Sequence, residues 1–182
     1  MFDEREVALL LQAFKYAAHK HRGQHRKDGE ASPYINHPID VVEILWRVGG
    51  VRDVSVLIAA VLHDTIEDTD ATPEQVAATF GDEIAALVQE VTDDKTLPKA
   101  VRKQLQIENA PHKSGAAKLI KLADKISNVR DVGFSPPASW SRDRRIEYLN
   151  WSEKVVAGLR GTNQSLEDRY DDILAQARAR LE

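Results

Sequence analysis

The sequence predicts an all-helical fold of about eight to ten helices, and three observations support this prediction. Apolar residues recur at intervals of three and four along most of the chain, which is the spacing of one helix face. Helix start signals are present, among them the capping box Thr72-Pro73-Glu74-Gln75. Nowhere do β-branched residues alternate with polar ones over a length that would predict a sheet.

The N-terminal part is predicted to contain three helices. The first covers residues 4–21. Its apolar stripe comprises Val7, Leu10, Leu11, Phe14, Ala17 and Ala18. After a glycine-bearing loop, Pro38 suits the first position of a second helix, which ends before Gly49-Gly50. The third, central helix begins at Asp53, stays apolar on nearly every side for several turns and carries polar residues in its last turns.

The rest of the chain is predicted to contain six more helices. They cover residues 73–80, 82–92, 98–109, 114–130, 141–160 and 164–180. Pro98 is placed to open the third of these, and Ser135-Pro136-Pro137 interrupts the chain before the last two. No internal repeat, low-complexity tract or long linker separates parts of the sequence. We therefore expect residues 1–182 to form a single domain.

The composition excludes several kinds of site and partner. The chain has no cysteine, which excludes disulfides, thiolate zinc sites and cysteine nucleophiles and leaves histidine and carboxylate as possible metal ligands. A net charge of −4 and the lack of a basic helical stripe argue against nucleic-acid binding. The charged start and the lack of a long apolar run predict a cytoplasmic protein without a membrane segment. Monomer and homodimer both remain open.

Imidazole and acidic side chains at the end of the central helix are the strongest functional signal. His63 and Asp64 are adjacent there, where a carboxylate faces the negative end of the helix dipole and is unfavourable without a compensating cation. Buried charge is also costly unless it is paired or bound to metal. His37 and Asp124 are candidates to complete a four-ligand site. Two imidazoles and two carboxylates suit Mn²⁺, with Fe²⁺, Mg²⁺ or Zn²⁺ as competitors.

Candidate catalytic and substrate-binding residues lie close to these ligands in the sequence. Glu67 and Asp68 are one helical turn beyond the adjacent histidine and aspartate, so we expect them to line the same side of the helix and to transfer protons. Arg22, Arg26 and Lys27 form a local basic cluster in an acidic chain. Beside a metal, such a cluster suits a phosphate-bearing substrate, because arginine binds phosphate oxygens in pairs and lysine supplies a point charge.

Ordered motifs give the chain a resemblance to a known family. A histidine, an adjacent His-Asp pair and a later aspartate form the signature of the HD hydrolase superfamily. The segments that resemble the hydrolase domain of RelA/SpoT proteins are 22–29, 33–38, 62–69 and 121–128. The segments 90–98 and 158–163 are similar to the stand-alone members, which are the metazoan SpoT homologue and the bacterial small alarmone hydrolases. The resemblance implies one helical HD-superfamily domain without synthetase or regulatory domains.

The resemblance also implies an activity and the residues that perform it. The family hydrolyses the 3′-pyrophosphate of ppGpp and pppGpp to GDP or GTP and pyrophosphate with Mn²⁺, by attack of a metal-bound water. The implied metal ligands are His37, His63, Asp64 and Asp124, and the implied catalytic residues are Glu67 and Asp68. The implied substrate-binding residues are Arg22, Arg26, Lys27, Lys99, Asn128, Arg144 and Tyr148. A small-molecule nucleotide is therefore the expected partner.

Three alternatives stay open on the sequence alone. The metazoan relative is also associated with removal of the 2′-phosphate of NADPH, and this substrate carries a phosphorylated ribose too. Adenine alarmones such as ppApp are a second option, because nothing in the sequence fixes the base. The third is a non-catalytic alarmone-binding or nucleic-acid-binding HD module. It is disfavoured because the metal ligands and the pair Glu67–Asp68 are all present, and a pure binding module need not keep both.

Overall fold

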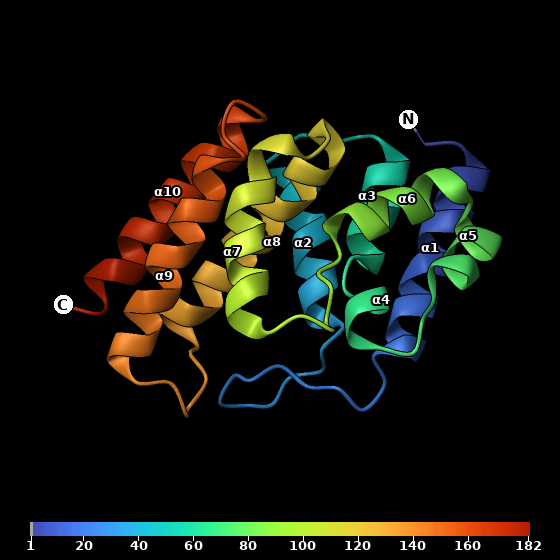
Figure 1. Cartoon of the computed structure of the whole chain (residues 1–182). Helices are drawn as coiled ribbons and strands as arrows, with labels where there is room; N and C mark the ends of the chain where they lie inside the picture. The colour runs from blue at the N-terminus through green and yellow to red at the C-terminus, as the bar shows by residue number, and fades with distance from the viewer. Residues whose placement is uncertain (1) are drawn as a thin grey trace.

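The computed structural model describes residues 2–182 and contains, within this range, ten α-helices, one 3₁₀-helix and no β-strand (Figure 1). The elements are α1 (Glu4–Lys20), α2 (Asn36–Arg47), α3 (Val54–Leu62), α4 (Thr65–Asp68), α5 (Pro73–Phe80), α6 (Asp82–Val91), α7 (Lys99–Asn109), η1 (Ala110–His112), α8 (Gly115–Phe134), α9 (Arg142–Ala157) and α10 (Gln164–Ala179). The predicted all-helical fold is confirmed. No helix in residues 2–182 is both long and apolar enough to cross a membrane.

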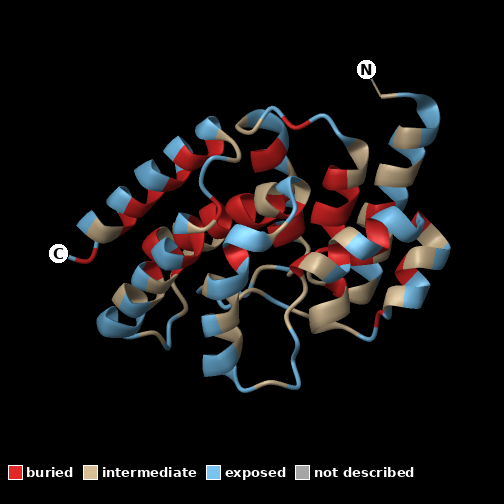
Figure 2. Ribbon diagram, turned by 45° about the horizontal axis from the view of Figure 1, so that its top comes forward, coloured by how far each residue is buried: buried red, intermediate tan, exposed pale blue. Residues whose placement is uncertain are grey.

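Helices α3 and α8 are central to the packing. Helix α3 packs against α1, α2, α6 and α8, while α8 also packs against α2, α6, α9 and α10. Figure 2 shows that buried residues concentrate in the inner helices, whereas the outer helices expose one face. Residues 56–62 of α3 are all buried, as expected for the predicted central helix. Polar groups placed at the end of α3 are therefore brought into the interior.

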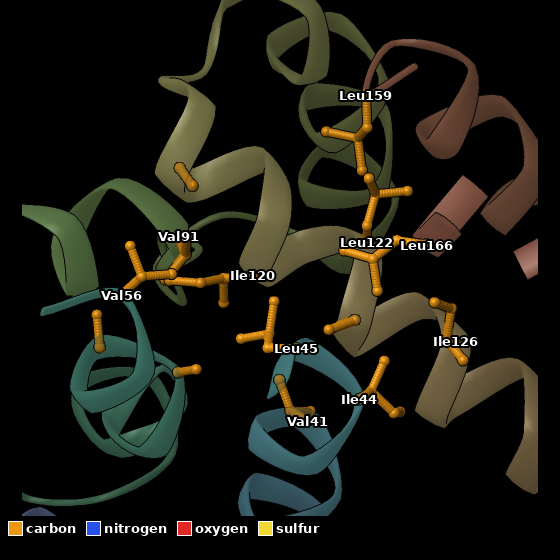
Figure 3. Close-up of a cluster of buried hydrophobic side chains, with 14 of the residues drawn as sticks. Val41, Ile44, Leu45, Val56, Val91, Ile120, Leu122, Ile126, Leu159 and Leu166 are labelled. Carbon is orange, nitrogen blue, oxygen red and sulfur yellow. The ribbon is translucent and has the colours of Figure 1, made fainter. Parts of the chain in front are cut away.

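One hydrophobic core joins the helices that position the site. Figure 3 shows side chains from α2, α3, α6 and α8 together with Leu159 and Leu166. Leu45 of α2 and Ile120 and Leu122 of α8 are fully buried there. Burying a leucine or isoleucine side chain contributes about 1.5–3 kcal/mol to stability. This packing fixes α2, α3 and α8 relative to one another.

The predicted apolar stripe of the first helix is only partly buried. Val7 is 42% exposed and Leu11 is 63% exposed, whereas Ala13 and Ala17 are fully buried. Helix α1 lies on the outside of the molecule (Figure 1), so that only a narrow strip of it contacts α3. The prediction that this stripe is buried was therefore wrong for Val7 and Leu11.

The second helix begins earlier than predicted, at Asn36 instead of Pro38. Backbone hydrogen bonds from Asn36 to Pro33 and from His37 to Tyr34 form the preceding turn. Proline is tolerated within the first helical turn because the amide that it lacks has no partner within the helix there. His37 is consequently held in the first turn of α2, next to the end of α3.

The central helix is interrupted where continuity was predicted. Helix α3 ends at Leu62, and α4 starts at Thr65. The Nδ1 atom of His63 donates to the carbonyl of Ala60 at 2.7 Å, and the Thr65 hydroxyl donates to the carbonyl of Leu62 at 2.6 Å. Side chains that donate to backbone carbonyls in this way compete with the backbone hydrogen bonds of a helix. The prediction that Glu67 and Asp68 continue the same face of one helix as His63 and Asp64 was therefore wrong.

The later helices follow the prediction more closely, with one extension. Helix α8 continues to Phe134, whereas the sequence predicted an end near residue 130. A Cβ atom on Gly133 would lie 2.7 Å from the Cβ of Ala177, so α8 and α10 approach closely at this position. The capping box at Thr72 is present as predicted. Packing against α10 explains the extra turn, because tertiary contacts override local propensity.

Candidate metal centre and active-site cleft

Three buried side chains from different parts of the fold converge near the centre of the molecule. His37 lies in the first turn of α2, His63 directly follows α3 and Asp124 lies within α8. One potential ligand atom from each residue lies within 4.8 Å of the others. Helices α2, α3 and α8 pack against one another (Figure 1), so the core brings these three side chains together.

Asp64 extends this cluster to the four ligands that the sequence predicted. Its Oδ2 atom lies 3.1 Å from Nε2 of His63 and 3.8 Å from Nε2 of His37. The Oδ1 atom of Asp124 lies 3.1 Å from Nε2 of His37 and 3.9 Å from Nε2 of His63. Each imidazole therefore faces two carboxylates. Two nitrogen and two oxygen donors form a set that hard or borderline divalent cations accept.

The hydrogen bonds of the two imidazoles favour metal ligation through Nε2. The Nδ1 atom of His63 donates to a backbone carbonyl, and Nδ1 of His37 lies 3.1 Å from the hydroxyl of Ser127. Among the described residues, buried Nε2 of His63 has no partner with hydrogen-bond geometry, although Oδ2 of Asp64 lies 3.1 Å away. Metal-binding histidines use one ring nitrogen as ligand while the other is held by a hydrogen bond. The residues present thus fit a divalent metal.

Electrostatics also favour a cation at this position. Burial lowers the pKa of His37, so this ring is neutral and free to act as a ligand. Burial alone would lower the pKa of His63, but Asp64 outweighs it and raises this pKa to about 9. Despite burial, His63 lowers the pKa of Asp64, and Lys125 and then His37 lower that of Asp124. Both carboxylates are therefore anions, and their charge favours a divalent ion.

The two candidate catalytic carboxylates lie on α4 and contact the loop between α6 and α7. The amide of Asp93 donates to Oε2 of Glu67 at 3.1 Å, and Lys95 forms an ion pair with Asp68. Lys95 and Arg102 also approach Oε1 of Glu67, at 3.8 and 3.6 Å. Burial raises the pKa of Glu67, an effect opposed by its hydrogen bond with Asp93. A carboxyl group with a raised pKa suits proton transfer near neutral pH.

Tyr34 links the candidate metal cluster to the candidate catalytic pair, Glu67 and Asp68. Its hydroxyl donates to Oδ2 of Asp64 at 2.5 Å and lies 3.4 Å from Oδ2 of Asp68. The ring stacks on His21 with a centroid distance of 4.7 Å. Burial raises the pKa of Tyr34, so the hydroxyl stays protonated and acts as a donor. Tyr34 therefore holds the carboxylate of Asp64 and lies next to that of Asp68.

A first cleft, with a volume of about 500 Å³, lies beside these groups. Arg26, Lys27, Asn128 and Asp68 are among the residues that line it. Arg26 contacts Asp131 at 2.6 Å and Asn128 at 3.1 Å. Asn128 in turn donates to Oδ1 of the metal-ligand candidate on α8. A chain of hydrogen bonds therefore connects the basic loop to the metal cluster.

A second and larger cleft, of about 900 Å³, lies between α7 and α9. Glu67, Lys99 and Arg144 line it. Trp140 and Tyr148 line both clefts, which are therefore neighbours. Burial raises the pKa of Tyr148 to about 12, so its hydroxyl remains neutral at physiological pH. The structure thus places six of the seven predicted substrate residues along the two clefts, namely Arg26, Lys27, Lys99, Asn128, Arg144 and Tyr148.

Arg22 is the predicted substrate residue that the structure does not bring to either cleft. Its guanidinium group contacts His19 at 2.7 Å and lines a separate small cavity with Asp70. Gly23 has a φ of +77°, which turns the chain between Arg22 and the residues that reach the first cleft. The sequence predicted one basic cluster of Arg22, Arg26 and Lys27. The turn at Gly23 separates Arg22 from the other two residues.

Sequence reasoning missed several contacts of the site. Lys95 forms an ion pair with the candidate catalytic residue Asp68, Lys125 lies 3.0 Å from Oδ2 of Asp124, and Ser127 contacts His37. Lys125 and Ser127 are buried neighbours of a predicted ligand in the sequence, and Lys95 belongs to the family-like segment 90–98. Their positions in the sequence could have marked these residues as part of the site. The sequence does not show, however, which distant residue each of them contacts.

Comparisons with known proteins agree with this geometry. Residues 13–148 match the HD domain family. The chain is 56% identical over 94% of its length to guanosine-3′,5′-bis(diphosphate) 3′-pyrophosphohydrolase MESH1 of Mus musculus, covering 96% of that protein. It is 54% identical to MESH1 of Homo sapiens, with the same coverage of both chains. A solved structure described as a metazoan orthologue of SpoT that hydrolyses ppGpp superimposes with a TM-score of 0.92 at 49% identity, covering 97% of both chains.

The chain therefore belongs to the HD-domain family. Its relatives in this family include the MESH1 proteins of Mus musculus and Homo sapiens, which are named as 3′-pyrophosphohydrolases. The predicted resemblance, the single helical HD fold and the prediction of an enzyme are confirmed.

Proposed function

We propose that this protein hydrolyses the 3′-pyrophosphate of guanosine 3′,5′-bis(diphosphate), releasing GDP and pyrophosphate, and that it converts the corresponding 5′-triphosphate to GTP. The observation that carries this proposal is the convergence of a two-histidine, two-aspartate cluster with a basic cleft. The names of the MESH1 relatives support the same reaction. Mn²⁺ is the proposed metal, because two imidazoles and two carboxylates suit it.

The two clefts accommodate the two phosphorylated ends of such a substrate. Arg26 contacts Asn128, which contacts Asp124, and Lys27 lines the same cleft, so both residues suit the 3′-pyrophosphate. Lys99 and Arg144 line the second cleft and suit the 5′-phosphates. Tyr148 lines both clefts and lies where the ribose would join the two ends. We place the base in the first cleft, which also has apolar lining.

The reaction requires two proton transfers that nearby residues can perform. Hydrolysis adds the oxygen of water to the phosphorus attached to O3′ and breaks the bond between that phosphorus and O3′. One proton must leave the water, and one must reach O3′. Glu67 is half-buried with a raised pKa, which suits a group that carries the proton to the leaving oxygen. Asp68, held by Lys95, is placed to accept the proton from water.

His37, His63, Asp64 and Asp124 would hold the metal. When bound, a divalent ion supplies Lewis-acid stabilisation of phosphoryl charge and lowers the pKa of a coordinated water. Lys125 donates to Oδ2 of Asp124 and Asn128 donates to Oδ1, so the two contacts fix the orientation of this carboxylate. Tyr34 does the same for Asp64. These contacts keep the ligand set in place before substrate binds.

A product assay tests the proposal. The protein loaded with Mn²⁺ is incubated separately with ppGpp, pppGpp, ppApp and NADPH, and pyrophosphate and phosphate are quantified together with the nucleotide products. We expect equimolar GDP and pyrophosphate from ppGpp, with a higher kcat/KM than for the other two substrate classes. A higher kcat/KM for NADPH, with release of phosphate, would replace the proposal with a 2′-phosphatase. No turnover of any of the four would contradict an enzymatic role at this site.

A further inference from the structure

The two oxygens of the Asp124 carboxylate have different partners. Oδ1 lies 3.1 Å from Nε2 of His37 and 3.9 Å from Nε2 of His63, so this oxygen faces the imidazole pair. Oδ2 accepts a hydrogen bond at 3.0 Å from the ammonium group of Lys125. Lys125 therefore engages one oxygen of the candidate ligand, while the other oxygen faces the histidines with which it would share a metal.

A second contact holds the ammonium group of Lys125. Its Nζ atom lies 4.8 Å from the ring centroid of Trp151 on α9. The indole nitrogen of Trp151 donates to the backbone carbonyl of Lys103 on α7 at 3.0 Å, which fixes the ring. An aromatic face attracts a cation, most strongly where water is excluded. Lys125 is only 3% exposed and lines neither cleft, so it is a fixed charge beside Asp124 and not a contact for substrate.

This buried charge changes the electrostatic balance of the candidate metal centre. Among the carboxylates of residues 2–182, only that of Asp124 has an oxygen within 4 Å of the ammonium group. With neutral imidazoles, the carboxylates of Asp64 and Asp124 would neutralise a divalent ion, and Lys125 leaves one positive charge in excess. Like charges repel strongly in a buried environment, because water screens them little there. Lys125 therefore opposes metal binding, and with the ion bound it leaves the site positively charged.

We propose that Lys125 is a positioning residue that holds Asp124 with Oδ1 toward the metal, weakens metal binding by its charge and thereby leaves a positive site for a polyanionic substrate. This inference rests on the proposed function and its metal site. Lys125 then has opposite effects on two ligands: it raises the dissociation constant of the metal and lowers the KM of the substrate. A residue that only supports the fold would not do so, because loosening the site weakens the binding of both.

Two substitutions of Lys125 test this opposition. Lys125→Met keeps an unbranched apolar side chain and removes both the charge and the hydrogen bond, whereas Lys125→Gln keeps an N–H donor and removes the charge. Lys154→Gln is the matched control, because Lys154 is an exposed lysine on the same helix as Trp151. Dissociation constants for Mn²⁺ are measured without substrate, by titrating the metal-free proteins and detecting free Mn²⁺ by electron paramagnetic resonance. The KM for ppGpp is then measured at saturating Mn²⁺, and circular dichroism verifies that each variant is folded.

We expect both Lys125 variants to bind Mn²⁺ about tenfold more tightly than wild type, because one neighbouring charge changes the binding of a proton by about this factor or more. The KM for ppGpp should rise about threefold to tenfold, since the same charge attracts the substrate. Lys154→Gln should leave both quantities unchanged.

Two results would overturn this inference alone. One is an affinity for Mn²⁺ in folded Lys125→Gln that equals or falls below that of wild type, and the other is tighter Mn²⁺ binding with an unchanged KM. Wild-type protein that does not bind Mn²⁺ would overturn the metal assignment and the inference with it. Wild-type protein that binds Mn²⁺ but hydrolyses no ppGpp would overturn the proposed function, whereas the Mn²⁺ affinities of the variants would still measure the effect of Lys125 on the metal.

Discussion

An ion pair joins Lys95, in the loop between α6 and α7, to Asp68 on α4. The same ammonium group lies 3.8 Å from Oε1 of Glu67, and the amide of Asp93 donates to the other oxygen of that carboxylate. One loop therefore holds both candidate catalytic acids. Because α4 is only one turn long, its own backbone cannot fix these side chains, and the loop supplies the missing constraint.

Replacing Lys95 should consequently affect the chemical step. Lys95→Met leaves Asp68 without its cationic partner, and we expect kcat to fall about threefold to tenfold, because this pair is partly exposed. The charge-conserving Lys95→Arg variant should recover most of the loss. Steady-state kinetics with ppGpp measure the effect, with Lys15→Met on α1 as a control. A rise in KM alone would assign Lys95 to substrate binding instead.

The catalytic assignment of Glu67 and Asp68 leads to a second prediction. Glu67→Gln and Asp68→Asn keep the shape of each side chain and remove its ability to exchange a proton. A general acid or base contributes about 10²–10⁴-fold to the rate, so kcat should fall within that range. Metal content, measured on the same samples, should stay at the wild-type value. Values of kcat within a factor of about two of wild type would mean that Glu67 and Asp68 only end the helix and take no part in the reaction.

The metal assignment predicts a different pattern. His63→Ala or Asp64→Ala removes a ligand from a buried cluster whose surrounding helices are held by the hydrophobic core. Metal content should be lost and activity should fall about 10³-fold or more, while circular dichroism stays helical. His112→Ala is a suitable control, because His112 is exposed. Full metal occupancy in both ligand variants would refute the assignment.

Local sequence patterns predicted much of this fold and site, and the failures have a common cause. The pattern of the four ligands located His37 and Asp124 although 87 residues separate them. Apolar periodicity predicted the helices but not the break at His63, which depends on side chains that bond to backbone carbonyls. The contact between Lys95 and Asp68 joins the loop after α6 to helix α4 through the tertiary fold. Such contacts leave no local signal, and for the same reason Arg22 was grouped with residues that the turn at Gly23 separates.

The basic loop leads to a prediction about substrate binding. Lys27 is exposed in the first cleft, so Lys27→Ala should raise the KM for ppGpp by about tenfold, as for loss of a charge-assisted contact, and should make KM less dependent on salt. Arg26→Ala should reduce kcat/KM more, because Arg26 also holds Asn128. Arg169→Ala, on the exposed face of α10, provides the control. Wild-type kinetics in both loop variants would place the pyrophosphate elsewhere.

The pKa of His63 predicts how the stability of the metal-free protein depends on pH. Asp64 raises this pKa in the folded state to about 9, compared with about 6.5 in an unfolded chain. The protonated ring therefore stabilises the fold fully below about pH 6.5, and this contribution is lost as the pH rises through about 9.

Thermal unfolding between pH 6 and 9.5 should accordingly show a falling Tm in the presence of a chelator. With Mn²⁺ bound, the metal takes the place of the proton on His63, and the decrease should be smaller. Asp64→Asn removes the carboxylate that raises the pKa, so the metal-free variant should lose the decrease over the same range. A metal-free wild-type Tm that stays constant from pH 6 to 9.5 would show that Asp64 does not keep the ring of His63 protonated in the folded protein.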